Sequence, residues 1–272
     1  MPALAHAAEP AAAFTGGYVG LNAGAAWGNS RHTTDPGCVP ASANGVFCNA
    51  SPDPTVVNGI AVAASGSGDL APSGFTGGLQ AGYNWRSGSF VFGGEADFGA
   101  FHLSRSVSPT GVFPSAFLGT TYALTESMST EWIATIRGRL GMTVTPQLLL
   151  YATGGLAMTN FRFSSSYSDN AIDITLPGGA GSGSRSELKA GWALGGGLEW
   201  MLHGRWSVKA EYLYVDFGSM NVAVPVSNTA AFSQTVTEGS RCFDEKQLTT
   251  RKKYDNIVRK SEYRTFLSIT NT

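Results

Sequence analysis

The chain has 272 residues, and its 18 lysines and arginines nearly balance its 19 aspartates and glutamates. This sparse, balanced charge argues against nucleic-acid binding, and an aromatic content of 11% argues against a disordered chain. No run of about 18 strongly apolar residues is present, which argues against a transmembrane helix. The 35 glycines suggest tight turns or a crowded barrel interior.

The first residues predict a processed leader. Ala5-His6-Ala7 has the small-x-small pattern of a signal-peptidase site, although no basic region and no long apolar region precede it. We therefore expect residues 1–13 to be a signal-peptide remnant and leader, with the mature protein beginning near Ala8. A flexible alanine-rich leader is the alternative.

Seven segments alternate with the period of two that indicates β-strands. In chain order they are residues 15–28, 74–85, 90–101, 130–143, 147–161, 187–200 and 206–217. One face of each segment is apolar and uncharged, while the other carries mostly glycine, small, polar or charged side chains. The fifth segment is ambiguous because both of its faces are fairly apolar.

The lengths of the connections separate a membrane barrel from a soluble sandwich, which would show the same alternation. Short links alternate with long ones: 86–89, 145–146 and 202–204 are short, whereas 29–73, 102–129, 162–186 and a fourth beginning at Gly218 are long. A meander with this pattern has tight turns at one end and long external loops at the other, as outer-membrane barrels do. Closure into a barrel also leaves no unpaired edge in lipid.

Large aromatic residues sort by depth along these segments, as the residues of an interfacial aromatic girdle do. The predicted girdle beside the short turns consists of Trp85, Phe90, Trp200 and Trp206. The predicted girdle toward the long connections consists of Trp27, Phe98 and Trp132.

Charged residues on the inward faces predict an ion network in the barrel lumen. Glu95 and Asp97 lie on the third segment, and Arg137 and Arg139 lie on the adjacent fourth segment, where cross-strand pairing is feasible. We expect the network to extend to Lys189, Glu199, Lys209 and Glu211. An eight-stranded interior is just wide enough for side chains, which favours structural filling of the lumen over an ion-selective constriction.

Cys38 and Cys48 lie in the first long connection, where an oxidising compartment predicts a loop disulfide, with two free thiols as the alternative. Cys242 is the odd cysteine. The four histidines are scattered, and no nucleophile elbow, zinc-protease motif or phosphate-binding loop occurs. We therefore predict no enzymatic activity, no cofactor and no metal site.

Four stretches carry a resemblance to a known family: GGYVGLNAGAAWG, GGLQAGYNWRSGSFVFGGEADF, IRGRLGMTVTPQLLLYATGGLA and GWALGGGLEWMLHGRWSVKAEYLYVDFG. They resemble the small porin-like outer-membrane β-barrel proteins of alphaproteobacteria, which are related in architecture to the eight-stranded OmpA-type membrane domain. The resemblance covers about residues 14–237.

The resemblance implies an all-β protein of the outer membrane, an eight-stranded antiparallel up-and-down transmembrane β-barrel. It also implies a structural or surface role in the cell envelope. The expected partners are outer-membrane lipid, the barrel-assembly machinery, and envelope or host surfaces touched by the loops. The alternative function is a porin-like channel for small solutes.

The composition changes near Glu238. Residues 238–272 hold 8 of the 18 basic residues and 5 of the 19 acidic ones, but only one of the 35 glycines. Family members usually end in an alternating strand with a terminal Phe, whereas this chain ends Asn271-Thr272. We treat residues 238–272 as an atypical tail, either a poor closing strand or disordered. A frameshift near Glu238 that removed the native closing strand is a further hypothesis.

Overall fold

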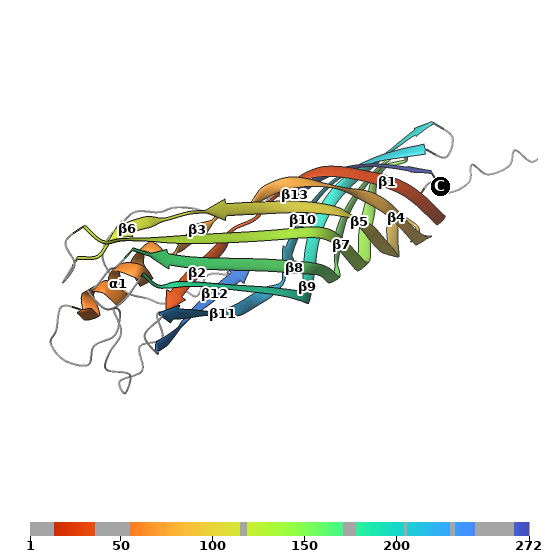
Figure 1. Cartoon of the computed structure of the whole chain (residues 1–272). Helices are drawn as coiled ribbons and strands as arrows, with labels where there is room; N and C mark the ends of the chain where they lie inside the picture. Colours follow the sequence, from red (N-terminus) through yellow and green to blue (C-terminus); the bar gives the residue numbers. More distant parts are fainter. Residues whose placement is uncertain are drawn as a thin grey trace, which may run out of the picture.

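The computed structural model describes residues 14–35, 55–114, 119–170, 178–203, 206–228, 232–242 and 264–271. Its strands form one elongated barrel, and helix α1 (Thr55–Ser65) lies at the end away from the short turns (Figure 1). Among the described residues, no helix is long and apolar enough to cross a membrane.

Eight strands pair side by side in a closed antiparallel ring. In ring order they are β1 (Gly16–Trp27), β4 (Ser73–Ser87), β5 (Phe90–Val107), β7 (Thr121–Thr145), β8 (Leu148–Asp169), β9 (Ala180–His203), β10 (Trp206–Asp216) and β13 (Arg264–Asn271). Strand β10 pairs with β9 and β13, and β13 also pairs with β1, which closes the ring. Since ring order follows chain order, the predicted eight-stranded up-and-down barrel is confirmed.

Shorter strands lengthen this wall beyond the ring. They are β2 (Ser30–Asp35), β3 (Gly68–Leu70), β6 (Thr110–Val112), β11 (Gly218–Asn228) and β12 (Phe232–Cys242). Strand β2 follows β1, β3 precedes β4, and β11 follows β10, so each continues a ring strand. Gly218, at the junction of β10 and β11, has a φ of 72°, a left-handed conformation that glycine adopts without strain.

Two separate segments of the tail form the eighth position of the wall. Strand β12 pairs with β11 and β2, and β13 pairs with β10 and β1. Cys242, the last residue of β12, pairs with Ser30 of β2, and Arg264, the first residue of β13, pairs with Ala26 of β1. Along β1 and β2, only residues 27–29 therefore separate the end of β12 from the start of β13. Residues 243–263 separate the two tail strands in sequence. The expected boundary between residues 237 and 238 therefore falls inside β12.

Four ring strands extend into regions where the sequence predicted long loops. Residues 102–129 and 162–186 were expected to be connections, but β5 continues to Val107, β7 begins at Thr121, β8 continues to Asp169 and β9 begins at Ala180. The long loop regions are therefore partly barrel wall. Trp27, Trp132 and Leu188 divide the wall in two. We call the part between these residues and the short turns the inner half, and the part on their other side the outer half.

The two halves have opposite polarity. In the inner half, apolar side chains point outward and polar ones inward, so Ile136 is 68% exposed while Arg137 is 4% exposed. In the outer half, Leu124 and Phe163 are buried in the lumen, and serines such as Ser166 lie on the outside. An apolar exterior fits hydrocarbon and a polar exterior fits water. The membrane therefore surrounds the inner half only.

A β-bulge in β7 contributes to the reversal of polarity between the two halves. The pairing of β7 with β8 shifts register between Thr130 and Ile133. Below the bulge the odd residues Ile133 and Arg137 point inward, whereas above it the even residues Met128 and Leu124 do. A bulge inserts an unpaired residue and so reverses the faces of the strand that follows.

Side chains fill the lumen in layers. The layer beside the short turns is an apolar cluster of Phe14, Val91, Leu149 and Tyr151. A layer of charged residues follows, and beyond it lies a larger apolar cluster that includes Phe101, Phe161, Phe163, Leu213 and Phe217. At the outer mouth, Val62 of α1 is buried with Phe113, Tyr122, Leu124 and Tyr167.

The polarity of the outer half predicts the labelling of two adjacent serines. In a background without the three native cysteines, we expect Ser166→Cys on intact cells to react with a membrane-impermeant maleimide. Ser165→Cys should remain unlabelled, because Ser166 is exposed and Ser165 is 3% exposed inside the lumen. Equal labelling of the two variants would show that the outer half does not have this fold.

Candidate functional site

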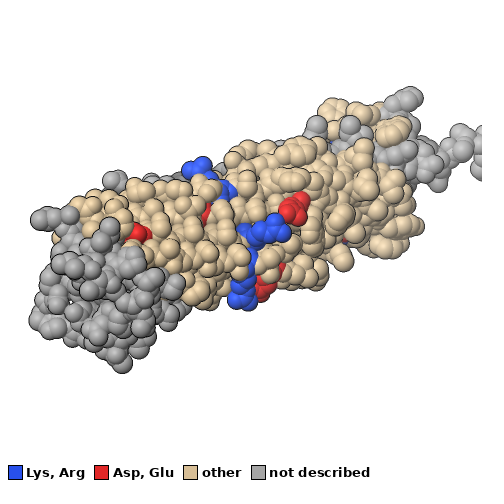
Figure 2. Space-filling model, viewed as in Figure 1, with Lys and Arg blue, Asp and Glu red and all other residues tan. Residues whose placement is uncertain are grey.

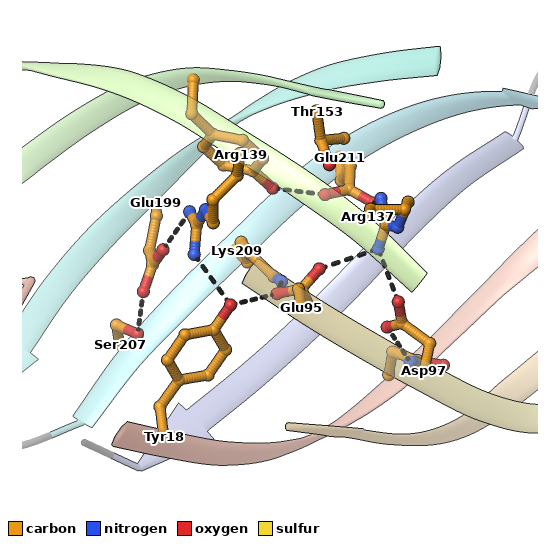
Figure 3. A network of polar contacts seen from close by, with 12 residues as sticks. Tyr18, Glu95, Asp97, Arg137, Arg139, Thr153, Glu199, Ser207, Lys209 and Glu211 are labelled. Atoms are coloured by element: carbon orange, nitrogen blue, oxygen red, sulfur yellow. Dashed lines mark hydrogen bonds and ion pairs between the residues drawn. The ribbon is translucent and has the colours of Figure 1, made fainter. Parts of the chain in front are cut away.

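A charged network crosses the lumen of the inner half (Figure 3). It brings together seven of the eight residues that the sequence placed in the lumen: Glu95, Asp97, Arg137, Arg139, Glu199, Lys209 and Glu211. They project from β5, β7, β9 and β10. The period-two alternation of each strand puts these residues on the inward face.

Arg137 is the centre of the network. Its Nη2 donates to Glu95 Oε1 and to Asp97 Oδ2, both at 2.7 Å, and its Nη1 donates to Glu211 Oε1 at 2.6 Å. The fixed fork of the guanidinium suits several carboxylates at once. This one side chain therefore joins β5, β7 and β10 through the interior of the barrel.

A second link spans the full width of the barrel. Lys209 Nζ of β10 donates to Glu95 Oε2 of β5, a strand four positions away in the ring. Tyr18 Oη donates to the same carboxylate oxygen at 2.6 Å. Glu95 thus receives an arginine, a lysine and a tyrosine, which compensates for the removal of its charge from water.

Arg139 forms the layer nearer the short turns. Its Nη2 donates to Glu199 Oε2 at 2.6 Å, and Ser207 Oγ donates to Glu199 Oε1 at 2.7 Å. The guanidinium carbon lies 4.1 Å from the ring centroid of Tyr151, a cation–π arrangement. Tyr151 Oη in turn donates to Glu211 Oε2 at 2.8 Å, which joins this layer to that of Arg137.

The composition of the network indicates a structural role. Arg137, Arg139 and Lys209 face the four carboxylates Glu95, Asp97, Glu199 and Glu211, and the charged side chains are buried, with at most 13% of any one exposed. Tyrosine, serine and threonine hydroxyls donate to these acids, including Thr135 Oγ1 to Asp97 at 2.7 Å. The acids are thus bonded to their neighbours, an arrangement that links the strands across the lumen.

Tyr18 and Tyr151 were missed by the sequence reasoning. Tyr18 stands on the polar face of β1, where it alternates with Gly20 and Asn22. Tyr151 lies on the strand whose two faces could not be told apart. The signal available for Tyr18 was a large residue with a polar hydroxyl on a face of small and polar residues. Its hydrogen-bond partners could not be predicted, because they lie on strands that are distant in the sequence.

The prediction that Lys189 joins the lumen network is wrong. Its Nζ donates to Ser219 O of β11 at 2.8 Å and lies 3.5 Å from Glu187 Oε1. The backbone ladder of β9 with β10 ends at Trp192, and the ladder with β11 resumes only at Gly181. Lys189 bridges this interrupted seam between β9 and β11, which draws it away from the centre of the lumen.

The aromatic residues chosen for the girdle lie on the outside of the barrel. Trp27, Trp85, Phe90, Phe98, Trp200 and Trp206 are between 46% and 61% exposed. Trp132 is half-buried and packs against Phe98, with ring centroids 6.0 Å apart. Cys38 and Cys48 lie outside the described residues, so their disulfide stays a prediction.

A small cavity borders the network. It measures about 20 Å³ and is lined by Thr76, Gln80, Asp97 and Leu213, among others. This is space for about one water molecule. At this size the cavity is much smaller than a solute-binding site.

A second buried polar contact lies in the outer half. His32 Nε2 of β2 is 2.7 Å from Glu126 Oε2 of β7, and both side chains are at most 5% exposed. Since β2 and β7 are not neighbours in the wall, this contact ties opposite parts of the outer half together.

Sequence comparisons with known proteins point to one family. A sequence model described as outer membrane protein beta-barrel domain matches residues 1–236. The 31 kDa outer-membrane immunogenic protein of Brucella melitensis biotype 1 is 35% identical over 219 residues, which cover 79% of this chain and 76% of that protein. The 22 kDa outer membrane protein of Rhizobium leguminosarum bv. viciae is 28% identical over 61% of this chain and 63% of its own length. Among solved structures, Neisserial surface protein A is 9% identical with a TM-score of 0.32, over 94% of this chain and 97% of that one.

Proposed function

Since the chain belongs to the outer membrane protein β-barrel domain family, we propose that it is a sealed structural barrel that presents its outer half at the cell surface. It resides in the outer membrane. The observation that carries the proposal is the layered filling of the lumen, in which the charged network lies between two apolar clusters.

Closure of the lumen argues against the alternative of a small-solute channel. A solute entering from outside would meet α1 and its apolar contacts, then the apolar layer around Phe161, and then Arg137 with its three carboxylates. To open this path, buried ion pairs would have to separate in a water-poor interior, which is costly. The lumen therefore contributes rigidity and not transport.

The outer half provides the surface for interactions with other molecules. Its wall is long and regular, and its exterior carries serine, threonine and charged side chains. The Brucella relative is named an immunogenic protein, which supports exposure of the corresponding surface in this chain. Envelope or host surfaces are the proposed contacts. The barrel-assembly machinery is the proposed partner during insertion.

A catalytic role is not part of this proposal. The relatives are outer-membrane proteins, and the acids of the inner half are bonded to arginine, lysine and hydroxyl groups. Glu95 and Asp97 share Arg137, and the cavity that Asp97 borders has space for only about one water molecule, so neither carboxylate faces a space that would admit a substrate.

Planar-bilayer recording tests the sealed lumen. We expect the purified protein to produce no stepwise current, because the side-chain layers leave space for about one water molecule beside the network. An open general porin reconstituted in the same bilayers serves as the positive control. Reproducible current steps that scale with the amount of folded protein would establish the channel function instead.

A further inference from the structure

Phe14 has an unusual backbone conformation where the chain enters the barrel wall. It lies two residues before β1, and its φ of 65° falls in the left-handed region. Among the residues that the structure describes, it is the one residue other than glycine with a positive φ. The Cβ of a bulky residue crowds the neighbouring carbonyl oxygen in this conformation, so the position is strained. Strain of this kind persists where surrounding contacts compensate for it.

The compensating contact is the burial of the phenyl ring. Phe14 is 2% exposed and belongs to the apolar cluster with Val91, Leu149 and Tyr151, against which Met201 packs. These residues come from β5, β8 and β9 and fill the lumen at the end of the short turns. An ordinary φ at Phe14 would redirect the chain and carry the ring out of this cluster. Burial of the ring and relief of the backbone strain therefore oppose each other.

The described wall around this cluster is closed to water. Strands β4, β5, β7, β8 and β9 are hydrogen-bonded side by side, and the exterior near the short turns carries Phe90, Met142 and Leu150. Figure 2 shows charged side chains gathered across the middle of the molecule, whereas the wall toward the short turns is largely uncharged. Because lipid surrounds this wall, water approaches the cluster through the mouth that Phe14 occupies.

The layer of Arg139 lies directly behind this cluster. Tyr151 belongs to both, since its ring centroid is 4.1 Å from the guanidinium carbon of Arg139 and its Oη donates to Glu211. Arg139 Nε and Asn84 Oδ1 are buried without a hydrogen-bond partner among the described residues. The register places Asn84 and Arg139 in one row, on either side of Gly93. A donor and an acceptor that water could satisfy thus lie behind the apolar cluster.

We propose that Phe14 is a strained stopper, which closes the short-turn mouth of the lumen and on release admits water to the layer of Arg139. This proposal rests on the sealed lumen proposed above and adds a place where the seal can open. In the open state the backbone of Phe14 relaxes, its ring leaves the cluster, and water bonds to Arg139 Nε and Asn84 Oδ1. The apolar cluster around Phe161 still closes the lumen beyond the network, so the open state is hydrated but does not conduct.

Gly16 allows the stopper to be tested without altering the phenyl side chain. Its φ is 105°, and no atom lies within 4 Å of the position that a Cβ would take. Alanine at this position is strained by its φ but meets no clash, so Gly16→Ala disfavours the turn that carries Phe14 into the lumen. Gly119, between β6 and β7, has a φ of 89° and equally open surroundings, so Gly119→Ala is the matched control.

Thiol labelling of the full chain in detergent tests the stopper. In a background without the three native cysteines, Val91→Cys reports water at the short-turn mouth, and Val215→Cys reports water beyond the charged network. These valines are 1% and 5% exposed. With a small charged methanethiosulfonate reagent, we expect Phe14→Ala to accelerate labelling of Val91→Cys at least about tenfold, because local opening controls access to the thiol. Gly16→Ala should also accelerate this labelling, and Gly119→Ala should leave its rate unchanged.

The second reporter and the control decide between the possible outcomes. Val215→Cys should stay unlabelled in every variant, and heat-modifiable mobility shows that each variant is folded. Unchanged labelling of Val91→Cys in Phe14→Ala would overturn the stopper, and so would an equal gain at Val215→Cys, which would mean that the whole lumen had loosened. Equal effects of Gly16→Ala and Gly119→Ala would overturn the role of the strained turn. Conductance of the unaltered protein is measured separately, so current steps would refute the sealed lumen whatever the labelling shows.

Discussion

Deleting residues 264–272 is expected to abolish the compact form of the barrel that resists detergent until it is heated. Without β13, β1 and β10 each present an edge of unpaired N–H and C=O groups within the inner half. Lipid supplies no partners for these groups, and each unsatisfied group costs several kcal/mol. A detergent gel of heated and unheated samples from the membrane fraction measures the effect, and the chain with residues 264–272 intact is the control.

The register of β13 gives this prediction a second test that does not depend on truncation. Ala23 of β1 pairs with Leu267, so cysteines at these two positions should form a disulfide on oxidation of the folded protein. The control pair is Ala23 with Phe266, which the same register places on opposite faces. The three native cysteines are replaced in both variants. A cross-link in the control pair alone would mean that β13 does not occupy this register.

Replacing Arg137 by Met is expected to lower the free energy of unfolding by about 3–5 kcal/mol, the usual cost of breaking a buried charge network by removing one partner. The variant leaves Glu95, Asp97 and Glu211 without their shared cation in the lumen. Urea unfolding in lipid vesicles, followed by tryptophan fluorescence, measures the change.

Two further variants serve as controls for the Arg137→Met result. Arg31→Met removes an arginine from an exposed pair with Asp69 and should cost far less, because solvent already screens that pair. Arg137→Lys should restore only part of the stability, since one ammonium cannot reproduce the fork that joins three carboxylates. If the Arg137 and Arg31 variants lose similar stability, the network is not what holds the lumen together.

The inner half was predictable because its two faces differ strongly. Ile136 and Leu140 alternate with Arg137 and Arg139, so period two alone assigns one set to lipid and the other to the lumen. Charges on adjacent strands then had to face each other, as Glu95 and Arg137 do. These inferences needed only the local pattern and the order of the strands.

The outer half was harder to predict for physical reasons. Phe161, Phe163 and Tyr167 alternate with polar residues, but the bulge after Thr130 breaks the corresponding pattern in β7. The position of Lys189 follows from an interrupted ladder between β9 and β11, a long-range property. In the tail, β13 is only eight residues long. So short a strand was hard to recognise in the sequence, because a longer charged segment without alternation precedes it.

The pairing of Val19 with Asn271 also constrains the order in which the protein is made. Synthesis delivers β1 early and β13 last, so every other ring strand is available before the wall can be completed. During that interval β1 and β10 must be kept from other chains, because unpaired strand edges are prone to aggregate. Defects in the final residues should therefore act on the yield of insertion, whereas defects in the lumen act on the lifetime of the finished barrel.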